Sequence, residues 1–275
     1  MHGSFIERST DEHVRLRRNL LERGAVLPPP SFNTIRARAS DSPIAVRDDI
    51  LGALRECGLA LVRLDEPLSN DRFTCFGSLL GTAMPERALE VKPYVEKEVI
   101  LNLVSEYRHT SDVALQPFAT NFLTLRTESS GQSKEDQPRY IVLMCCEPGD
   151  EATVAQTVLV PMTAVEQQLT ESEVAMLSLT RYRNGYGVPS IVRSLGGRLV
   201  FSIRDFLCSP LGWRYAGDNR AVNTAIRALL ASMYDPNAAR GIHWTRGMLV
   251  VFDNRFFSHG RTAGRISTSV RRRQT

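Results

Sequence analysis

Apolar residues recur at helical spacing in three parts of the chain. Residues 44–58, 69–81 and 218–235 each place apolar side chains along one side of a helix. Ser69 is a suitable N-cap for the second of these helices. Thr170 and Glu173 have the spacing of a capping box, which predicts that another helix begins at Thr170.

The middle and the end of the chain have the pattern of strands. Residues 139–148 form a continuous apolar run that ends at Pro148-Gly149, which is typical of a central strand. The other expected strands are 59–64, 98–107, 121–128, 152–162 and 247–261, the last ending in a polar turn. These strands do not alternate regularly with helices, which disfavours a doubly wound parallel sheet. The pattern predicts a mainly β protein, a sandwich or jelly roll with flanking helices.

The pattern also predicts the domain organisation. Residues 1–43 are rich in arginine and contain Pro28–Pro30, which cannot continue a helix, so we expect an N-terminal extension. Residues 44–275 then form a single domain, and no internal repeat is present. Residues 193–219 and the segment after Glu106 are irregular, and we expect them to be loops that form a lid over a substrate.

Composition narrows the class of protein. Hydrophobic residues make up 43% and charged residues 23% of the chain, which is ordinary for a soluble globular protein. No apolar run is long enough for a transmembrane helix, and the charged N-terminus does not resemble a secretory signal. The five cysteines are odd in number and irregularly spaced, which favours a reducing compartment, the cytoplasm.

The net charge of +4 comes from the C-terminal tail. Residues 261–275 hold five arginines and no acidic residue, and the rest of the chain is close to neutral. Such a tail can bind nucleic acid or anionic lipid. No aromatic platform or recognition motif accompanies it, so we expect neither a nucleic acid nor a membrane as partner. The sequence does not indicate an oligomeric state.

The candidate chemistry lies at two places. Residues 121–128 end in Arg126-Thr127-Glu128, where Arg126 and Glu128 share one face of a strand. This resembles half of a metal site, with arginine in place of histidine. Near the C-terminus, His259 follows a hydrophobic strand and a polar turn, and Arg271 comes twelve residues later. Histidine supplies a neutral nitrogen to iron, and arginine supplies a bidentate fork for a dicarboxylate.

These residues resemble the iron(II)- and 2-oxoglutarate-dependent oxygenases of the taurine dioxygenase and clavaminate synthase-like family. The resemblance is carried by Leu125-Arg126-Thr127-Glu128, by Gln137-Pro138 with the strand to Cys145, and by Thr157. It is completed by Phe252-Asp253-Asn254, His259-Gly260-Arg261-Thr262 and Arg271. Order and spacing match from about Leu59 to the C-terminus. The resemblance implies a double-stranded β-helix, or jelly roll, with a facial triad of two histidines and a carboxylate.

The family's site residues can be carried over to the matching positions. The resemblance implies that Glu128 and His259 bind iron(II), with Arg126 at the position of the missing proximal histidine. It implies that Thr157 lies beside 2-oxoglutarate and that Arg271 binds its distal carboxylate, with Arg273 as an alternative. The implied substrate is a small, amino-acid-like molecule of specialised metabolism.

Two positions depart from the family pattern. The guanidinium of Arg126 has no lone pair to donate and stays protonated, so it cannot bind iron. It can instead pair with Glu128, which then loses an oxygen that the metal needs. Related enzymes often carry a second arginine four residues after the clamp, where this chain has Thr275. Arg272 or Arg273 could replace it.

Two other histidines are alternatives for the third metal ligand. His109 lies in a polar segment near Asp112, and we expect His243 to lie on the strand that precedes the turn. We expect His109 to have the better claim, although both residues suit other roles, as a surface histidine and as a packing residue.

Three functions therefore follow from the sequence. The first is an active iron(II)- and 2-oxoglutarate-dependent hydroxylase. The second is a pseudoenzyme, a ligand-binding or partner protein on the same fold with an impaired metal site. The third is a redox-neutral enzyme in which Arg126 stabilises an oxyanion or a carboxylate. We expect the first, because His259 and Arg271 are both present.

Overall fold

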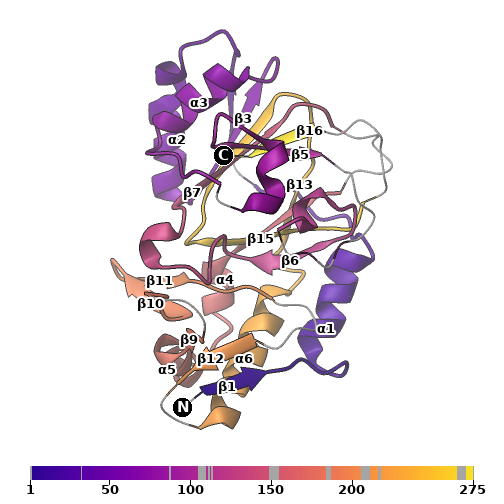
Figure 1. Ribbon diagram of the computed structural model, residues 1–275, viewed down its shortest axis with the longest axis vertical. Helices are drawn as coiled ribbons and strands as arrows, with labels where there is room; N and C mark the ends of the chain where they lie inside the picture. Colours follow the sequence, from indigo (N-terminus) through magenta and orange to yellow (C-terminus); the bar gives the residue numbers. More distant parts are fainter. Residues whose placement is uncertain are drawn as a thin grey trace.

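The computed structural model describes most of the chain. The described residues are 2–31, 33–86, 88–104, 110, 112, 114–148, 155–183, 187–205, 211–215, 218–264 and, for the backbone, 271–274. Two large β-sheets lie at the centre, with helices on their outer sides (Figure 1).

The two sheets share an antiparallel arrangement, apart from one edge pair, β2 and β3, which is parallel. In spatial order the smaller sheet holds β13 (Arg240–Ile242), β8 (Thr157–Pro161), β15 (Phe257–Arg261) and β6 (Leu123–Arg126). The larger sheet holds β2 (Thr34–Ala37), β3 (Leu59–Leu64), β14 (Met248–Asp253), β7 (Tyr140–Cys145), β16 (Arg271–Gln274), β5 (Ile100–Val104) and β4 (Val95–Glu96). The mainly β, jelly-roll fold with flanking helices is confirmed.

The core between the sheets follows from the alternation of side chains along each strand. Leu59 and Leu61 of β3 belong to an apolar cluster that also contains Leu159 of β8, from the other sheet. The intervening Ala60 and Val62 pack on the opposite face, against helices. Successive side chains of a strand point to opposite faces, so each sheet has one face toward the other sheet and one toward the helices.

Helices cover the outer faces. The outer face of the larger sheet packs against α2 (Pro43–Glu56) and α3 (Asn70–Ser78), at the top of Figure 1. The apolar cluster on the outer face of the smaller sheet includes residues from η1 (Arg18–Glu22), α4 (Met162–Glu166), α5 (Glu171–Leu179) and α6 (Asn219–Met233). Two short 3₁₀ helices, η3 (Gln116–Phe118) and η4 (Lys134–Asp136), connect strands, and a third, η2 (Leu89–Tyr94), lies between α3 and β4.

The local signals in the sequence predicted where these helices begin. Ser69 accepts a hydrogen bond from the backbone of Arg72 at the start of α3. Thr170 and Glu173 form the expected reciprocal capping box of α5. Both caps satisfy backbone N–H groups that have no partner inside the helix. These predictions of N-caps are confirmed.

One expectation about loops is wrong. Residues 193–219 contain strands as well as loops: β10 (Val192–Leu195) and β11 (Arg198–Phe201) form a hairpin. β12 (Leu211–Arg214) joins β1 (His2–Phe5) and β9 (Arg181–Tyr182) in a three-stranded sheet. These strands are only two to four residues long, and β12 pairs with β1, which is distant in sequence, so their periodicity is too short to read.

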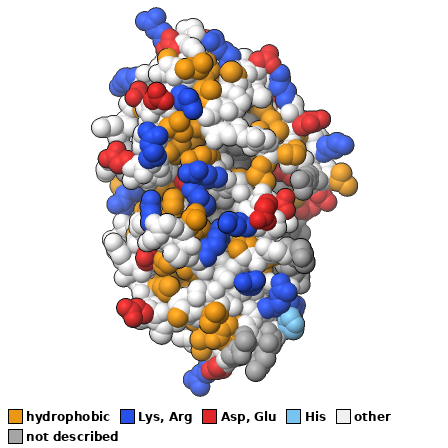
Figure 2. Space-filling model, turned by 90° about the vertical axis from the view of Figure 1, so that its left-hand side faces the viewer, with side chains coloured by type: hydrophobic (Ala, Val, Ile, Leu, Met, Phe, Trp, Pro, Cys, Tyr) orange, Lys and Arg blue, Asp and Glu red, His pale blue; other side chains and the backbone are white. Residues whose placement is uncertain are grey.

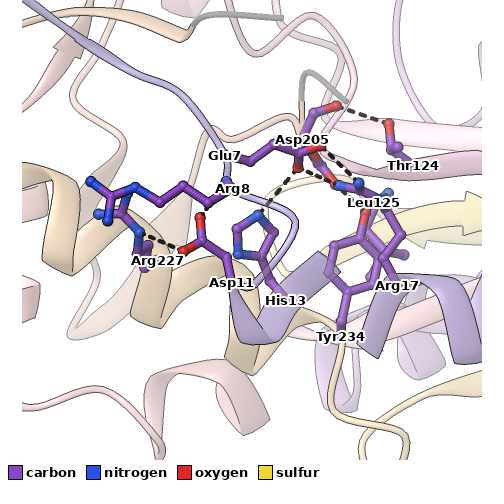
Figure 3. Close-up of polar contacts among 10 residues, drawn as sticks. All are labelled: Glu7, Arg8, Asp11, His13, Arg17, Thr124, Leu125, Asp205, Arg227 and Tyr234. Carbon is purple, nitrogen blue, oxygen red and sulfur yellow. Dashed lines mark hydrogen bonds and ion pairs between the residues drawn. The ribbon is translucent and has the colours of Figure 1, made fainter. Parts of the chain in front are cut away.

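The N-terminal residues are attached to the rest of the chain by buried charges. Arg17, in α1 (Glu12–Arg17), is 2% exposed and donates hydrogen bonds to Glu7 at 2.8 and 2.9 Å and to Asp205 at 2.8 Å. Tyr234 donates to the same Asp205 oxygen at 2.7 Å. We call Glu7, Arg17, Asp205 and Tyr234 the outer charge cluster (Figure 3). The division into an N-terminal extension and one domain stays a prediction.

The surface agrees with the ordinary composition. None of the helices in the described residues is long and apolar enough to cross a membrane. On the face seen in Figure 2, Lys and Arg side chains are interspersed with Asp, Glu and hydrophobic residues, and several lie near the middle of the view.

Candidate active site

The site is built where β6 and β15 lie side by side in the smaller sheet. His259 of β15 is paired with Arg126 of β6 on one side and with Leu159 of β8 on the other. Paired residues share a face of a sheet, and Leu159 belongs to the core between the sheets. His259 and Arg126 therefore face the interior of the jelly roll, although they are separated by more than a hundred residues in sequence.

Glu128 connects these two side chains. One of its oxygens, Oε2, lies 3.4 Å from Nε of Arg126 and 3.4 Å from Nε2 of His259. The side chains of Arg126 and His259 are each 9% exposed, whereas that of Glu128 is 32% exposed. The structure thus brings together the three residues that the sequence predicted, and Arg126 contacts Glu128 as expected for a paired guanidinium.

Asn254 holds the backbone of Glu128 in place. Its side-chain oxygen accepts a hydrogen bond from the Glu128 N–H at 2.7 Å, and its amide nitrogen donates to the Glu128 carbonyl at 3.1 Å. The same amide nitrogen donates to the Pro138 carbonyl at 3.0 Å. Asn254 is buried, so these bonds are protected from water. This residue positions the carboxylate, and the motif Asp253-Asn254 in the sequence was the signal for it.

The neighbouring Asp253 stabilises the turn that follows β14. Its carboxylate accepts from the Arg255 backbone at 3.0 Å and from the Arg255 guanidinium at 2.9 and 2.6 Å. Asp253 therefore caps that turn.

The charges around Glu128 keep it ionised. Burial favours the neutral acid, but the positive charge of Arg126 and the hydrogen bond with His259 together hold the pKa of Glu128 well below its usual range. The pKa of His259 is also lowered, because burial and the nearby charge of Arg126 disfavour the imidazolium despite the attraction of Glu128. Near neutral pH the site therefore offers an ionised carboxylate and a neutral imidazole.

Sequence reasoning missed Arg204. Arg204 is the antiparallel bridge partner of Arg126 on the edge of the smaller sheet. It donates through Nη2 to the Gln116 side chain at 3.0 Å, and its backbone N–H donates to the Tyr182 hydroxyl at 2.8 Å. Burial, followed by the charge of Arg126, lowers the pKa of Arg204. No motif marks Arg204, because it lies in the segment that resembled a loop. We call Arg126, Arg204, Glu128 and His259 the inner charge cluster.

The residues expected to hold 2-oxoglutarate are placed only in part. Thr157 lies at the start of β8, is buried, and accepts a hydrogen bond from the Trp244 indole at 3.1 Å. Its backbone is paired with that of Ile242, a residue of the core between the sheets. Arg271 and Arg273 lie on β16, and their backbones are paired with those of Val104 and Asn102 of β5. Their roles, and that of Thr157, stay predictions.

Of the two alternative histidines, His243 is not joined to this site by any described contact. His243 is exposed and its Nε2 lies 2.9 Å from the Leu27 carbonyl. His109 lies outside the described residues.

The described donor set fits part of an iron site. Two donor atoms that each lie about 2.1 Å from a metal ion, at right angles to each other, are about 3 Å apart. Glu128 Oε2 and His259 Nε2 lie 3.4 Å apart, which is near the separation of two ligands of one ion. Within the described residues no group of three His, Cys, Asp or Glu side chains could hold a metal. Arg126 lies beside the same carboxylate, and its guanidinium has no lone pair for a metal, so Glu128 and His259 are the two candidate ligands among the described residues.

Comparisons with known proteins agree with the fold. Residues 29–273 match the family described as "Taurine catabolism dioxygenase TauD, TfdA family". No curated protein matches the sequence. The family match confirms the resemblance that the motifs indicated, while the exchange of the proximal histidine for Arg126 stays a prediction.

Several solved structures are similar. An asparagine oxygenase in complex with Fe(II), hydroxyasparagine and succinate has a TM-score of 0.61 and 18% identity, over 84% of this chain and 78% of that chain. PvcB, an Fe, alpha-ketoglutarate-dependent oxygenase from an isonitrile synthetic pathway, has a TM-score of 0.59 and 19% identity, over 90% and 83%. The non-heme iron oxygenase OrfP, in complex with Fe, succinate and (3S)-hydroxy-L-Arg, has a TM-score of 0.62 and 12% identity, over 88% and 93%.

Proposed function

This chain belongs to the TauD, TfdA family of dioxygenases, and from that premise we propose that it is an iron(II)- and 2-oxoglutarate-dependent oxygenase of the hydroxylase type. The observation that carries the proposal is the approach of Glu128 and His259 on the inner face of the jelly roll. The proposed substrate is a small, amino-acid-like molecule of specialised metabolism. Asparagine oxygenase and OrfP, whose structures hold hydroxylated amino acids, support that substrate class.

Glu128 and His259 are the residues that hold the metal in this proposal. The low pKa of Glu128 keeps its carboxylate ionised, and the low pKa of His259 keeps a lone pair on the imidazole. Asn254 holds the backbone of Glu128 and thereby orients the carboxylate. Iron with 2-oxoglutarate supplies the oxidising chemistry for a C–H bond, and the buried faces of the two sheets exclude water from it.

Thr157, Arg271 and Arg273 are the proposed contacts of 2-oxoglutarate. Thr157 suits this role because it is buried on the same inner face, beside Trp244. Arg271 is proposed to bind the distal carboxylate, with Arg273 as the alternative. We further propose that the protein works in the cytoplasm on a soluble small molecule, without a nucleic acid or membrane partner.

A second candidate function is favoured by the contact between Arg126 and Glu128. If Arg126 keeps the carboxylate, the chain is a pseudoenzyme, a ligand-binding or partner protein on the oxygenase fold, or a redox-neutral enzyme that uses Arg126. Iron uptake separates this candidate from the first.

The experiment that tests the oxygenase is anaerobic addition of Fe²⁺ and 2-oxoglutarate to the full chain. We expect iron to remain bound after desalting and the visible charge-transfer band of the iron–2-oxoglutarate chelate to appear. Glu128→Ala and His259→Ala should lose both signals, whereas the matched control His243→Ala should keep them. A wild-type protein without iron and without the band would favour the second candidate.

The 2-oxoglutarate clamp has its own test. Arg271→Ala should abolish calorimetrically measured binding of 2-oxoglutarate to the iron-loaded protein, because it leaves a buried carboxylate without its partner. Arg272→Ala is the matched control on the same strand and should bind normally. Loss of binding in Arg273→Ala, with normal binding in Arg271→Ala, would move the clamp to Arg273.

A further inference from the structure

The inner charge cluster places two arginines against each other. Hydrogen bonds from the Thr127 N–H to the Ile203 carbonyl, at 2.8 Å, and from the Asp205 N–H to the Leu125 carbonyl, at 3.1 Å, flank Arg126 and Arg204. This is the pattern of a non-hydrogen-bonded antiparallel pair, in which side chains come closest, with Cα atoms about 4.5 Å apart. Like charges directly opposite each other destabilise a sheet, so this arrangement carries a cost.

Arg126 itself is poorly satisfied. Its Nη1 is buried and has no hydrogen-bond partner among the described residues. Its contact with Glu128 runs through Nε at 3.4 Å, which is long for a charge-assisted hydrogen bond, and His259 lies equally close to that oxygen. The terminal nitrogens of a buried guanidinium normally have hydrogen-bond partners, and a guanidinium with an unpartnered terminal nitrogen is a candidate for binding a ligand.

The neighbouring groups define the charge of that ligand. Among the described residues, two guanidiniums, from Arg126 and Arg204, and one carboxylate, from Glu128, face this point. Asp205 follows Arg204 in the chain, and its Oδ2 accepts from Arg17 and Tyr234 on the other side of the sheet edge. These three groups sum to one positive charge, which a single carboxylate would neutralise and a doubly charged phosphate would exceed.

We propose that Arg126 and Arg204 form a binding site for a ligand carboxylate beside Glu128 and His259. The buried Nη1 of Arg126 donates to the ligand, and the guanidinium of Arg204 balances its charge from the opposite strand. This site needs no metal, so it goes beyond the proposed oxygenase and stands whether or not iron binds. The carboxylate belongs either to a dicarboxylate or to the α-carboxylate of an amino acid.

Calorimetric titration of the full chain, freed of metal with a chelator, tests the site with succinate, L-asparagine and inorganic phosphate at constant ionic strength. We expect the wild type to bind a carboxylate more tightly than phosphate. Arg126→Gln and Arg204→Gln should each raise the carboxylate Kd by about tenfold or more, since each removes a positive charge from the site. The matched control is Arg193→Gln. This half-buried arginine of β10 donates to Ser202 at 2.6 Å, and its Kd should change by less than about twofold.

The probes separate the two sources of the carboxylate. Loss of succinate binding in the Gln variants identifies a dicarboxylate, and loss of L-asparagine binding identifies an α-carboxylate. Arg126→Lys and Arg204→Lys keep the charge without the planar fork, so they should bind with intermediate affinity and serve if the Gln variants do not fold.

Three results would overturn the proposal. The first is the absence of carboxylate binding by the metal-free wild type. The second is tighter binding of phosphate than of either carboxylate. The third is carboxylate binding that is lost in Arg271→Ala but unchanged in the Arg126 and Arg204 variants. Because metal is absent throughout, none of these results bears on the iron test of the oxygenase.

Discussion

Two buried charge clusters lie on opposite sides of one short segment, residues 203–205. Asp205 belongs to the outer charge cluster, where Arg17 makes three hydrogen bonds of 2.8–2.9 Å to two carboxylates (Figure 3). Arg204 belongs to the inner charge cluster, where Arg126 makes one contact of 3.4 Å to a carboxylate that it shares with His259. The alternation of side chains along an extended segment sends consecutive residues to different clusters.

The difference between the clusters separates a structural role from a functional one. Although burial opposes the charge of Arg17, its bonds to Glu7 and the charge of Asp205 raise its pKa above the ordinary arginine value. Both terminal nitrogens of Arg17 donate to carboxylates of the chain, and its Nε has no partner among the described residues. In the inner charge cluster a like charge stands opposite Arg126, and a donor is left open. Buried charges with a like-charged neighbour and an unpartnered donor are typical of functional sites.

Replacing the two arginines should have very different effects on stability. Arg17→Gln leaves Glu7 and Asp205 buried without their partner, and should lower the free energy of unfolding by about 3–5 kcal/mol. Arg126→Gln removes the like-charge repulsion with Arg204, and should change the free energy of unfolding by less than about 1 kcal/mol in either direction. Urea unfolding at pH 7, followed by circular dichroism, measures both. Equal losses would mean that the two clusters are both structural.

Replacing Arg126 with histidine should strengthen iron binding. Arg126→His removes a positive charge and adds a neutral nitrogen donor beside Glu128 and His259, which completes a set of three ligands. The Kd for Fe²⁺ should fall by about tenfold or more, equivalent to about 1.4 kcal/mol. Anaerobic titration with Fe²⁺ in the presence of 2-oxoglutarate measures the change through the charge-transfer band.

The control for this substitution is Arg139→His, which puts a histidine at an exposed arginine outside the site. It should leave the iron affinity unchanged. If Arg126→His behaves in the same way, Arg126 does not stand at the position of a lost ligand.

Tyr234→Phe should weaken the outer charge cluster alone. The hydroxyl donates to Asp205 at 2.7 Å and accepts from the Leu125 N–H at 3.1 Å, so its loss should cost about 1–3 kcal/mol in unfolding free energy. Iron uptake should stay normal, because the inner charge cluster keeps its residues. A variant of normal stability that loses iron would contradict the separation of the clusters.

The effect of Tyr234→Phe on stability should also depend on pH in the alkaline range. Burial and the charge of Asp205 raise the pKa of Tyr234 well above its ordinary value of 10.0. Above about pH 10 the unfolded chain releases this proton while the folded chain keeps it, so this stabilising contribution is lost as the pH rises. The stability advantage of the wild type over Tyr234→Phe should therefore shrink between about pH 8 and about pH 11, measured by urea unfolding.

Local patterns in the sequence determined much of the fold. Helix caps such as Ser69 and the pair Thr170 and Glu173 act within one turn, so their chemistry can be read from neighbouring residues. The apolar run of β7 identified a central strand because both of its faces are buried. The motif residues Glu128 and His259 were found, and with them the family.

Only the tertiary structure decided what surrounds those residues. Arg204 meets Arg126 through a single bridge between segments that are far apart, and Arg17 meets Asp205 across an even longer stretch of chain. Neither pairing leaves a periodic signal, because each depends on one contact and not on a repeat along a strand. Periodicity and capping report the elements that a chain can form, whereas the partner of a buried charge depends on how distant elements pack.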